Sequence, residues 1–254
     1  MSVLREIEQE LGRLTDPQRA AHLQRFFKTG PGEYAEGDRF RGIRVPVLRK
    51  LVNRYEHVKL ADAAALLESR YHEDRLLALL MFVRMTAAGD RETREDIYRL
   101  YLKKTAFINN WDLVDTSAEH IIGAHLDGKS KTPLNRLARS ECLWERRMAV
   151  MATFYDIKRG RFQQILRLAE MLIDDPHDLI HKVVGWMLRE VGKRDLRAAE
   201  GFLREHCRRM PRTMLRYAIE RFPETKRQAY LSGSAEYGKM KCTQGPSGAT
   251  GLTG

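Results

Sequence analysis

The sequence contains few cysteines. Three occur in 254 residues, Cys142, Cys207 and Cys242, and none forms a CxxC pair or another spacing typical of zinc ligands. An odd number of scattered cysteines argues against a disulfide framework. The cysteine content therefore predicts a protein of a reducing compartment, the cytoplasm, without a metal site.

Long apolar runs are missing as well. No stretch of about eighteen uncharged apolar residues occurs, so no transmembrane helix is expected. The first residues, MSVLREIEQELGRL, carry charged side chains throughout and lack the apolar core of a secretory signal. No segment alternates apolar and polar residues for long, which argues against β-strands. We therefore expect neither a membrane partner nor a sheet.

Familiar catalytic and nucleotide-binding motifs are also absent. Residues 30–42, GPGEYAEGDRFRG, are rich in glycine but match neither GxxxxGK[ST] nor GxGxxG. No HExxH motif and no serine nucleophile elbow occurs. We interpret residues 30–42 as an irregular loop that packs Tyr34 and Phe40, and we expect neither a nucleotide cradle nor a zinc protease site.

The apolar residues that are present recur with a helical period. Leu4, Ile7, Leu11 and Leu14, for example, fall on one face of a helix. Proline- and glycine-containing breakers separate segments of about ten to eighteen residues, which suits short helices joined by short loops. The pattern predicts an all-α protein of roughly eleven helices.

A weak internal repeat refines this prediction. Small or β-branched residues stand at the centres of five apolar segments, with spacings of 36, 35, 36 and 33: Ala78, Val114, Ala149, Gly185 and Ala218. A period in the mid-thirties with two helices per unit is typical of α-solenoids, although helices of similar length can share a spacing by chance. We predict an α-solenoid superhelix in which equivalent positions face the same side of a curved stack.

The periodic pattern ends near residue 231. The following stretch, SGSAEYGKMKCTQGPSGATGLTG, is rich in Gly, Ser and Thr and has almost no large apolar residues. Such a segment buries too little surface to offset its ordering entropy. The sequence predicts one domain over residues 1–231 and a disordered tail over residues 232–254.

Positive charge is concentrated in two stretches. The net charge is +11, and residues 136–167 hold eight Lys/Arg against three Asp/Glu, while residues 182–227 hold thirteen against six. The rest of the chain is nearly neutral. A localised positive field is typical of proteins that bind a polyanion such as nucleic acid, and the alternative is that the charge only serves solubility.

Four residues near the repeat centres are candidates for chemistry. Trp111 and Asp115 are four positions apart on one helix face, so ring and carboxylate could together hold a cation or a sugar that develops positive charge. Arg147 and Trp186 fall near the next centres, and a solenoid would bring them to the same side. The alternative is that both tryptophans are core residues, that Asp115 caps a helix or pairs with an arginine, and that Arg147 forms an interhelical salt bridge. We expect Trp144 to be a core residue.

Further basic residues in the same half are candidates for phosphate contacts, because arginine and lysine position a duplex without reading its sequence. The alternative is that these side chains are merely solvated. The candidates are Arg146, His181, Lys182, Arg189, Arg212 and Arg216.

Four segments resemble the AlkD-type DNA alkylation repair family, the HEAT-like-repeat DNA glycosylases. They are FFKTGPGEYAEGDRFRGIRVPVLRKL, FINNWDLVDTSAEHIIG, LWERRMAVM and HKVVGWMLREVGKRD. The resemblance covers residues 20 to 231, and the WDxVD and GWxLRE motifs occur in the family's order.

The resemblance implies a fold, an activity and roles for residues. It implies a monomeric superhelix of HEAT-like repeats that binds duplex DNA in a concave basic cleft, without a metal or cofactor. It implies hydrolysis of the N-glycosidic bond of N3-methyladenine and N7-methylguanine in base excision repair, without base flipping. By motif position, Trp111 and Trp186 would flank the sugar of the lesion, Asp115 would be the catalytic carboxylate and Arg147 would contact the phosphate.

Other functions remain open at this point. One is a non-catalytic helical-repeat protein that binds damaged or branched DNA, and another is a glycosylase for bulky alkyl adducts. A third is a protein–protein scaffold, the commonest use of solenoids. The glycosylase is preferred because the set of catalytic residues is complete.

Overall fold

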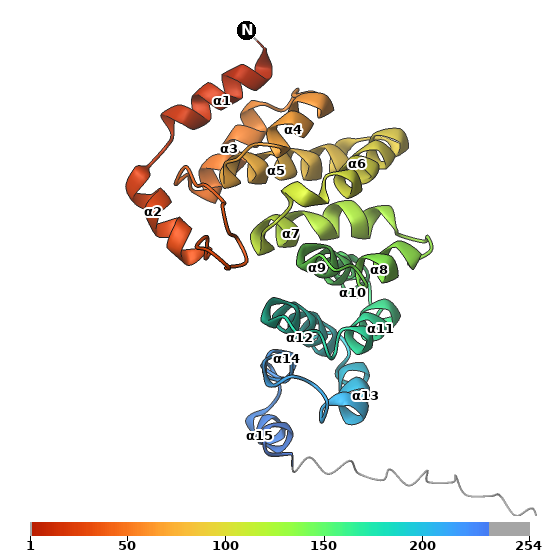
Figure 1. Ribbon diagram of the computed structural model, residues 1–254. Coiled ribbons are helices and arrows are strands. Elements are labelled where there is room, and N and C mark those ends of the chain that lie inside the picture. Colours follow the sequence, from red (N-terminus) through yellow and green to blue (C-terminus); the bar gives the residue numbers. More distant parts are fainter. Residues whose placement is uncertain (1, 234–254) are drawn as a thin grey trace, which may run out of the picture.

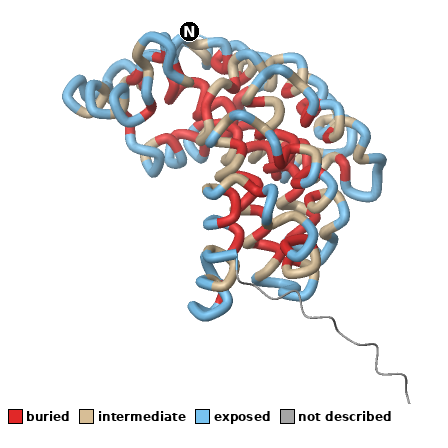
Figure 2. Tube along the Cα trace, turned by 60° about the horizontal axis from the view of Figure 1, so that its bottom comes forward, coloured by how far each residue is buried: buried red, intermediate tan, exposed pale blue. Residues whose placement is uncertain are grey.

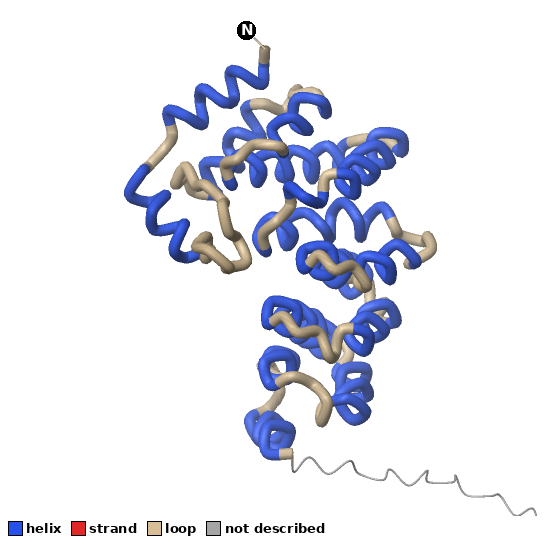
Figure 3. The backbone as a smooth tube through the Cα atoms, viewed as in Figure 1, coloured by secondary structure: helices blue, strands red, loops and turns tan. Residues whose placement is uncertain are grey.

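The computed structural model describes residues 2–233, and within them the chain is helical with no β-strand (Figures 1 and 3). The α-helices are α1 (Val3–Arg13), α2 (Pro17–Phe26), α3 (Val45–Arg54), α4 (Leu60–Leu67), α5 (His72–Ala88), α6 (Arg91–Lys103), α7 (Trp111–Ala118), α8 (Thr132–Leu137), α9 (Leu143–Ala152), α10 (Phe154–Ile157), α11 (Gln163–Met171), α12 (Asp178–Gly192), α13 (Leu196–His206), α14 (Arg212–Ala218) and α15 (Glu224–Ser232). A short 3-10 helix η1 (Thr105–Phe107) precedes α7, and a π-helical turn η2 (Glu119–Gly123) follows it. The all-α prediction is confirmed, with more and shorter helices than the roughly eleven expected.

Side-chain caps fix where several helices begin. Asp16 accepts the backbone N–H of Arg19 at the start of α2, where Pro17 occupies the first turn. Asp90 and Asp195 cap α6 and α13 in the same way. These aspartates satisfy N–H groups that have no partner within the helix, so the polar breakers of the sequence become helix starts.

The helices form a two-layered stack. Helices α5, α7, α9, α12 and α14 pack on one another in that order and form the inner layer. Helices α6, α8, α11 and α13 form the outer layer, and α2 lies on the opposite side of the stack from them, while α4 packs on α5 (Figure 1). This arrangement confirms the predicted α-solenoid of helical repeats.

Glycines show that the packing repeats. A Cβ on Gly185 would lie 2.5 Å from the carbonyl oxygen of Met214, and a Cβ on Gly123 would lie 2.4 Å from that of Ala152. In both pairs the contacted residue follows the glycine by 29 positions. The same close approach therefore occurs twice, between η2 and α9 and between α12 and α14, and a side chain at either glycine would collide with the backbone.

A hydrogen bond made by arginine also recurs in two repeats. Arg75 and Arg146 each donate from Nη1 to the carbonyl oxygen six positions earlier, Ser69 and Ser140 respectively, at 3.0 and 3.1 Å. The two arginines occupy equivalent places relative to the repeat centres Ala78 and Ala149. The repeat alignment read from the sequence therefore corresponds to equivalent contacts in space.

One continuous apolar core runs along the stack, from Ile7 to Phe222 (Figure 2). The repeat centres are fully buried, and Trp144 is 7% exposed, as expected for a core residue. Phe40 is also buried, while Tyr34 is half-buried against the core. Within residues 2–233, no helix has the length and apolar character needed to cross a membrane.

The end of the described chain bears on the predicted tail. Helix α15 ends at Ser232, and Gly233 caps it with φ +73°. The remainder of the predicted tail, residues 234–254, lies outside the described residues. The boundaries of the single domain, residues 1–231, stay a prediction.

Candidate functional site

A cavity of about 560 Å³ opens between the N-terminal region and the inner helices. We call it the aromatic cavity. Its lining residues come from α2 and the segment after it, from α7 and α9, from the start and middle of α12, and from α14: Phe26, Lys28, Tyr34, Trp111, Arg147, His177, Asp178, Leu179, Lys182, Trp186 and Tyr217. Three of the four proposed catalytic residues thus line one cavity, and the fourth, Asp115, is bonded to Arg147.

Trp111 is the first residue of α7 and lies between core and cavity. Asn110 caps the helix by accepting the Trp111 N–H at 2.8 Å. The indole stacks on Phe27 with 5.3 Å between ring centroids and an interplanar angle of 19°, and Phe26 meets it edge-on at 6.3 Å. One face of the tryptophan is therefore fixed by aromatic packing while the residue still lines the cavity.

Asp115 and Arg147 form a bidentate ion pair. Arg147 donates from Nε and Nη2 to the two carboxylate oxygens at 2.8 and 2.7 Å, and from Nη1 to the carbonyl oxygen of Leu179 at 2.7 Å. These three bonds use three of the five N–H bonds of the guanidinium, and the other two have no hydrogen-bond partner among residues 2–233. The pairing of Asp115 with an arginine, considered in the sequence, is present in the structure.

Burial shapes the acidity of this carboxylate. Desolvation raises the pKa of Asp115 above its usual value, the Arg147 guanidinium opposes the rise, and the charge of Asp112 adds to it. The pair thus combines a desolvated carboxylate with a cation that favours its ionised form.

Trp186 lies on α12, next to the close approach at Gly185. It is half-buried, and its ring centroid is 6.2 Å from that of Phe154. Trp111 and Trp186 are therefore both partly exposed at the aromatic cavity, which differs from the fully buried core position considered for them in the sequence.

The six predicted phosphate contacts have different surroundings. Lys182 lines the cavity and pairs with Asp178 at 2.7 Å. Arg146 pairs with the Asp175 carboxylate at 2.7 Å, and His181 donates to the carbonyl oxygen of the same residue at 2.5 Å. Those two side chains hold the loop before α12.

The other three lie further along the stack. Arg189 pairs with Glu220, and Arg212 donates to the carbonyl oxygen of Leu231 at 2.6 Å. Arg216 is exposed and makes no hydrogen bond or ion pair within residues 2–233. Their contact with DNA stays a prediction, and Arg216 is the one whose charge is entirely available.

Lys28 is a cavity residue that the sequence did not single out. Its φ is +54°, a left-handed conformation that only this residue and several glycines adopt within residues 2–233. Such strain is concentrated at functional sites and is held by the surrounding structure. Its ammonium adds a third cationic side chain to Arg147 and Lys182 around the cavity. The only sequence signal was its place within the resembling segment FFKTGPGEY.

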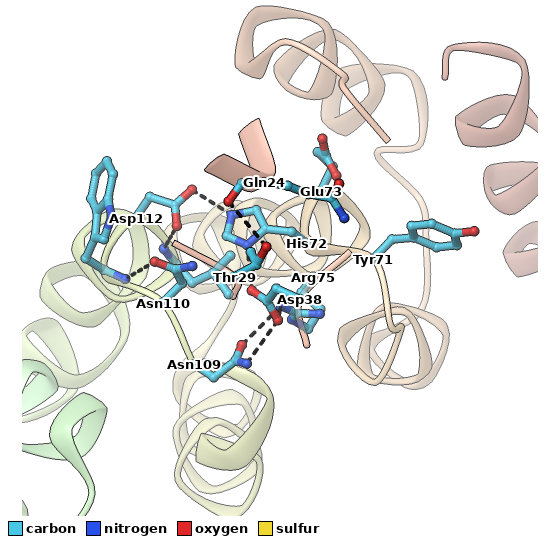
Figure 4. A network of polar contacts seen from close by, with 12 residues as sticks. Gln24, Thr29, Asp38, Tyr71, His72, Glu73, Arg75, Asn109, Asn110 and Asp112 are labelled. Atoms are coloured by element: carbon cyan, nitrogen blue, oxygen red, sulfur yellow. Dashed lines mark hydrogen bonds and ion pairs between the residues drawn. The ribbon is translucent and has the colours of Figure 1, made fainter. Parts of the chain in front are cut away.

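A buried charged cluster holds the N-terminal segment against the stack (Figure 4). The cluster includes the first four residues of α5, each of which is at most 4% exposed: His72, Glu73, Asp74 and Arg75. Glu73 accepts the backbone N–H groups of residues 41, 42 and 43 at 2.8, 2.7 and 3.2 Å. The sequence analysis missed this cluster, because a run of four charged residues at a helix start is ordinarily solvated.

The remaining members of the cluster reach the same segment. Asp74 binds Arg41 through two hydrogen bonds of 2.6 and 2.9 Å, and Arg75 binds Asp38 at 2.7 Å. The loop that follows the cavity residues Phe26 and Lys28 is thus fixed by ionic contacts to the first inner helix.

Metal ligands are not gathered anywhere within residues 2–233, where no group of three or more His, Cys, Asp or Glu side chains has the arrangement to hold an ion.

Fold and cavity together define the class of protein: an all-α solenoid whose inner helices gather aromatic rings, cations and a paired carboxylate at one cavity. The chain belongs to the family of DNA alkylation repair enzymes, whose sequence model matches residues 7–222. No curated protein sequence matches it.

Solved structures are similar as well, among them the following two. One is described as a predicted DNA alkylation repair enzyme from Enterococcus faecalis, with a TM-score of 0.64 and 17% identity over 83% of this chain and 97% of that chain. The other is smu.31 from Streptococcus mutans UA159, with a TM-score of 0.49 and 16% identity over 81% and 98% of the two chains. The first similarity supports the fold.

Proposed function

We propose that this protein is a DNA glycosylase that releases cationic alkylated purines, N3-methyladenine and N7-methylguanine, from duplex DNA in base excision repair. The observation that carries the proposal is the bidentate Asp115–Arg147 pair at a cavity lined by Trp111 and Trp186. Family membership supports repair of alkylated DNA, and the cavity supplies the chemistry for breaking a glycosidic bond.

The substrate itself provides the leaving group. An alkylated purine carries a positive charge, so the bond between C1′ and the purine nitrogen breaks with both electrons going to the base, which leaves neutral. The sugar becomes oxocarbenium-like, water adds to C1′, and one proton is released. No general acid is required, and one carboxylate suffices.

Asp115 is the group that stabilises this sugar cation. A preorganised negative charge in a desolvated site acts on developing positive charge more strongly than it would in water. Trp111 and Trp186 add the attraction of their ring faces for the same cation. Arg147 keeps the carboxylate ionised and fixes its orientation.

The cationic side chains around the cavity are positioned to bind the phosphate groups of the DNA backbone. Two N–H bonds of Arg147 together with the ammonium groups of Lys28 and Lys182 offer contacts to phosphate oxygens. We propose that backbone and sugar enter the cavity while the lesion stays in the stack. We further propose that the enzyme acts as a monomer without a cofactor, which the family resemblance supports, and in the cytoplasm, which the few scattered cysteines support.

The test is release of 3-methyladenine and 7-methylguanine from methylated duplex DNA, with wild type beside Asp115→Asn. The asparagine keeps the size of the side chain and one acceptor oxygen for Arg147, but it removes the charge and the second acceptor. We expect wild type to release both bases and the variant to lose about 100-fold or more of the rate. Duplex affinity and the circular dichroism spectrum serve as controls for folding.

Two outcomes would overturn the proposal. Full activity of the variant would remove Asp115 from the chemistry. No release by wild type, with tight duplex binding retained, would instead indicate a non-catalytic DNA-binding protein or an enzyme for bulkier adducts.

A further inference from the structure

His72 lies buried between two carboxylates that come from different parts of the chain (Figure 4). Its Nδ1 is 3.3 Å from Asp38 Oδ2 in the N-terminal segment, and its Nε2 is 2.8 Å from Asp112 Oδ2 on α7. The ring also stacks on Phe40 at 4.6 Å and packs near Phe27 at 5.0 Å. The residue therefore connects α5, α7 and the N-terminal segment at one point.

Geometry defines the charge of this ring. An ionised carboxylate only accepts hydrogen bonds, so both ring nitrogens satisfy their partners only if both carry a proton. Burial raises the pKa of Asp38, but His72 and Arg75 outweigh this effect and hold that pKa below its usual value. With Asp38 ionised on one side and Asp112 on the other, the imidazolium is the form that fits.

The connection leads directly to the aromatic cavity. Asp112 follows Trp111, and its second carboxylate oxygen accepts the N–H of Leu113 at 2.9 Å, so it fixes the first turn of α7. The charge of Asp112 also raises the pKa of Asp115. A cation on His72 offsets that charge, just as Arg147 offsets the charge of Asp115.

We propose that His72, as an imidazolium held between Asp38 and Asp112, is a positioning residue of this site. It sets the start of α7, and with it Trp111, against the N-terminal segment, and it balances the charge of Asp112 beside the catalytic carboxylate. Its effect on catalysis rests on the proposed glycosylase activity, whereas its protonation does not.

The charged groups around His72 agree with this role. Burial disfavours the imidazolium, but the charge of Asp112 and the hydrogen bonds to Asp112 and Asp38 outweigh it and raise the pKa of His72 to about 9, with Arg75 of the same helix opposing. A pKa raised on folding stabilises the fold through the protonated form. The contribution is therefore complete below about pH 6.5, the value of an unfolded histidine, and is lost as the pH rises through about 9.

The first experiment observes the ring directly. Nitrogen-15 NMR of the full chain reports the protonation of both ring nitrogens, and the spectrum of His72→Gln assigns the signals. We expect both nitrogens of His72 to carry protons at neutral pH. We expect the ring to lose one of these protons with a pKa of about 9. A ring with one unprotonated nitrogen at neutral pH would overturn the proposal, whatever the activity of the enzyme.

The second experiment links the charge to the site. Single-turnover base release by wild type should fall with a midpoint near pH 9. In Asp112→Asn the midpoint should move to lower pH, because the carboxylate that favours the imidazolium is gone. A purely structural role of Asp112 would lower the rate equally at every pH and leave the midpoint in place, and that result would contradict the proposal.

The histidine variants complete the test. His72→Gln should lose about ten- to a hundredfold of the rate at neutral pH, as expected for a displaced catalytic constellation, and should lack the alkaline fall. His125→Gln is the matched control. The ring centroid of His125 is 3.8 Å from that of Tyr98, and His125 lines a different cavity from the aromatic cavity. Equal losses in the two variants would contradict a role specific to His72.

Discussion

The Asp115 carboxylate has to be ionised to stabilise a sugar cation, although burial raises its pKa. The Arg147 guanidinium reconciles these two demands, because its charge lowers the pKa that desolvation raises. In the proposed mechanism the ion pair therefore serves catalysis as well as structure. The coupling between the two residues should therefore appear as a pH dependence of the rate.

We expect base release to fall as the pH is lowered through the pKa of Asp115, because only the ionised form is active. In Arg147→Gln this acid limb should move to higher pH, since the cation that favours the carboxylate is lost. Arg147→Lys is the matched variant, because it keeps the charge and should leave the limb closer to that of wild type. Single-turnover rates measured against pH give the comparison, and an unmoved limb in Arg147→Gln would exclude the coupling.

At the scale of single residues, sequence and structure agree where a residue type is rare and its spacing is distinctive. Trp111, Arg147 and Trp186 line one cavity, and Asp115 forms an ion pair with Arg147, as their places near the repeat centres suggested. Lys28 and His72 were missed for physical reasons. A left-handed φ has no signature in a lysine, and the burial of His72 depends on carboxylates 34 and 40 positions away.

At the scale of helices, the apolar period predicted which segments are helical, and the repeat predicted how they stack. The boundaries were less predictable, because short pieces such as α10 depend on packing against neighbouring helices. The glycine before Trp186 is the clearest case of agreement. Gly185 was identified from the sequence as a repeat centre, and in the structure it is buried at this centre and faces the carbonyl oxygen of Met214.

This close approach predicts a change in stability. Gly185→Ala should lower the free energy of unfolding by about 1–3 kcal/mol, because the new Cβ would lie 2.5 Å from a backbone oxygen that cannot easily move. Gly201→Ala on α13 is the matched control: its Cβ would meet only the end of the Arg204 side chain, at 3.9 Å. There the higher helix propensity of alanine should raise stability by up to about 1 kcal/mol.

Urea unfolding followed by circular dichroism measures both variants. The two substitutions are chemically identical and differ only in what surrounds the glycine. Equal effects in the two variants would mean that α12 and α14 do not pack as closely as described, and the repeated glycine contact would lose its significance.

At the scale of the whole molecule, the net charge of +11 and its concentration in two stretches predict binding of a polyanion. The structure sharpens this prediction, because many of the basic side chains in these stretches are paired with carboxylates, as Arg146 is with Asp175 and Arg189 with Glu220. Composition alone does not separate paired from available charge. The DNA contacts should therefore depend on the few cations that remain available on the inner side.

Arg216 and Arg136 provide the comparison that decides this point. Both are exposed and neither makes an ion pair within residues 2–233, but Arg216 lies on inner helix α14 beside the cavity residue Tyr217, whereas Arg136 lies on outer helix α8. If duplex DNA binds along the inner layer, Arg216→Ala should weaken binding and lower the slope of log K against log salt by about one, the effect of one lost phosphate contact. Arg136→Ala should leave the slope unchanged although it removes the same net charge. Fluorescence anisotropy of a labelled duplex over a series of salt concentrations measures both slopes, and equal slopes for the two variants would show that DNA responds to net charge rather than to the inner face of the solenoid.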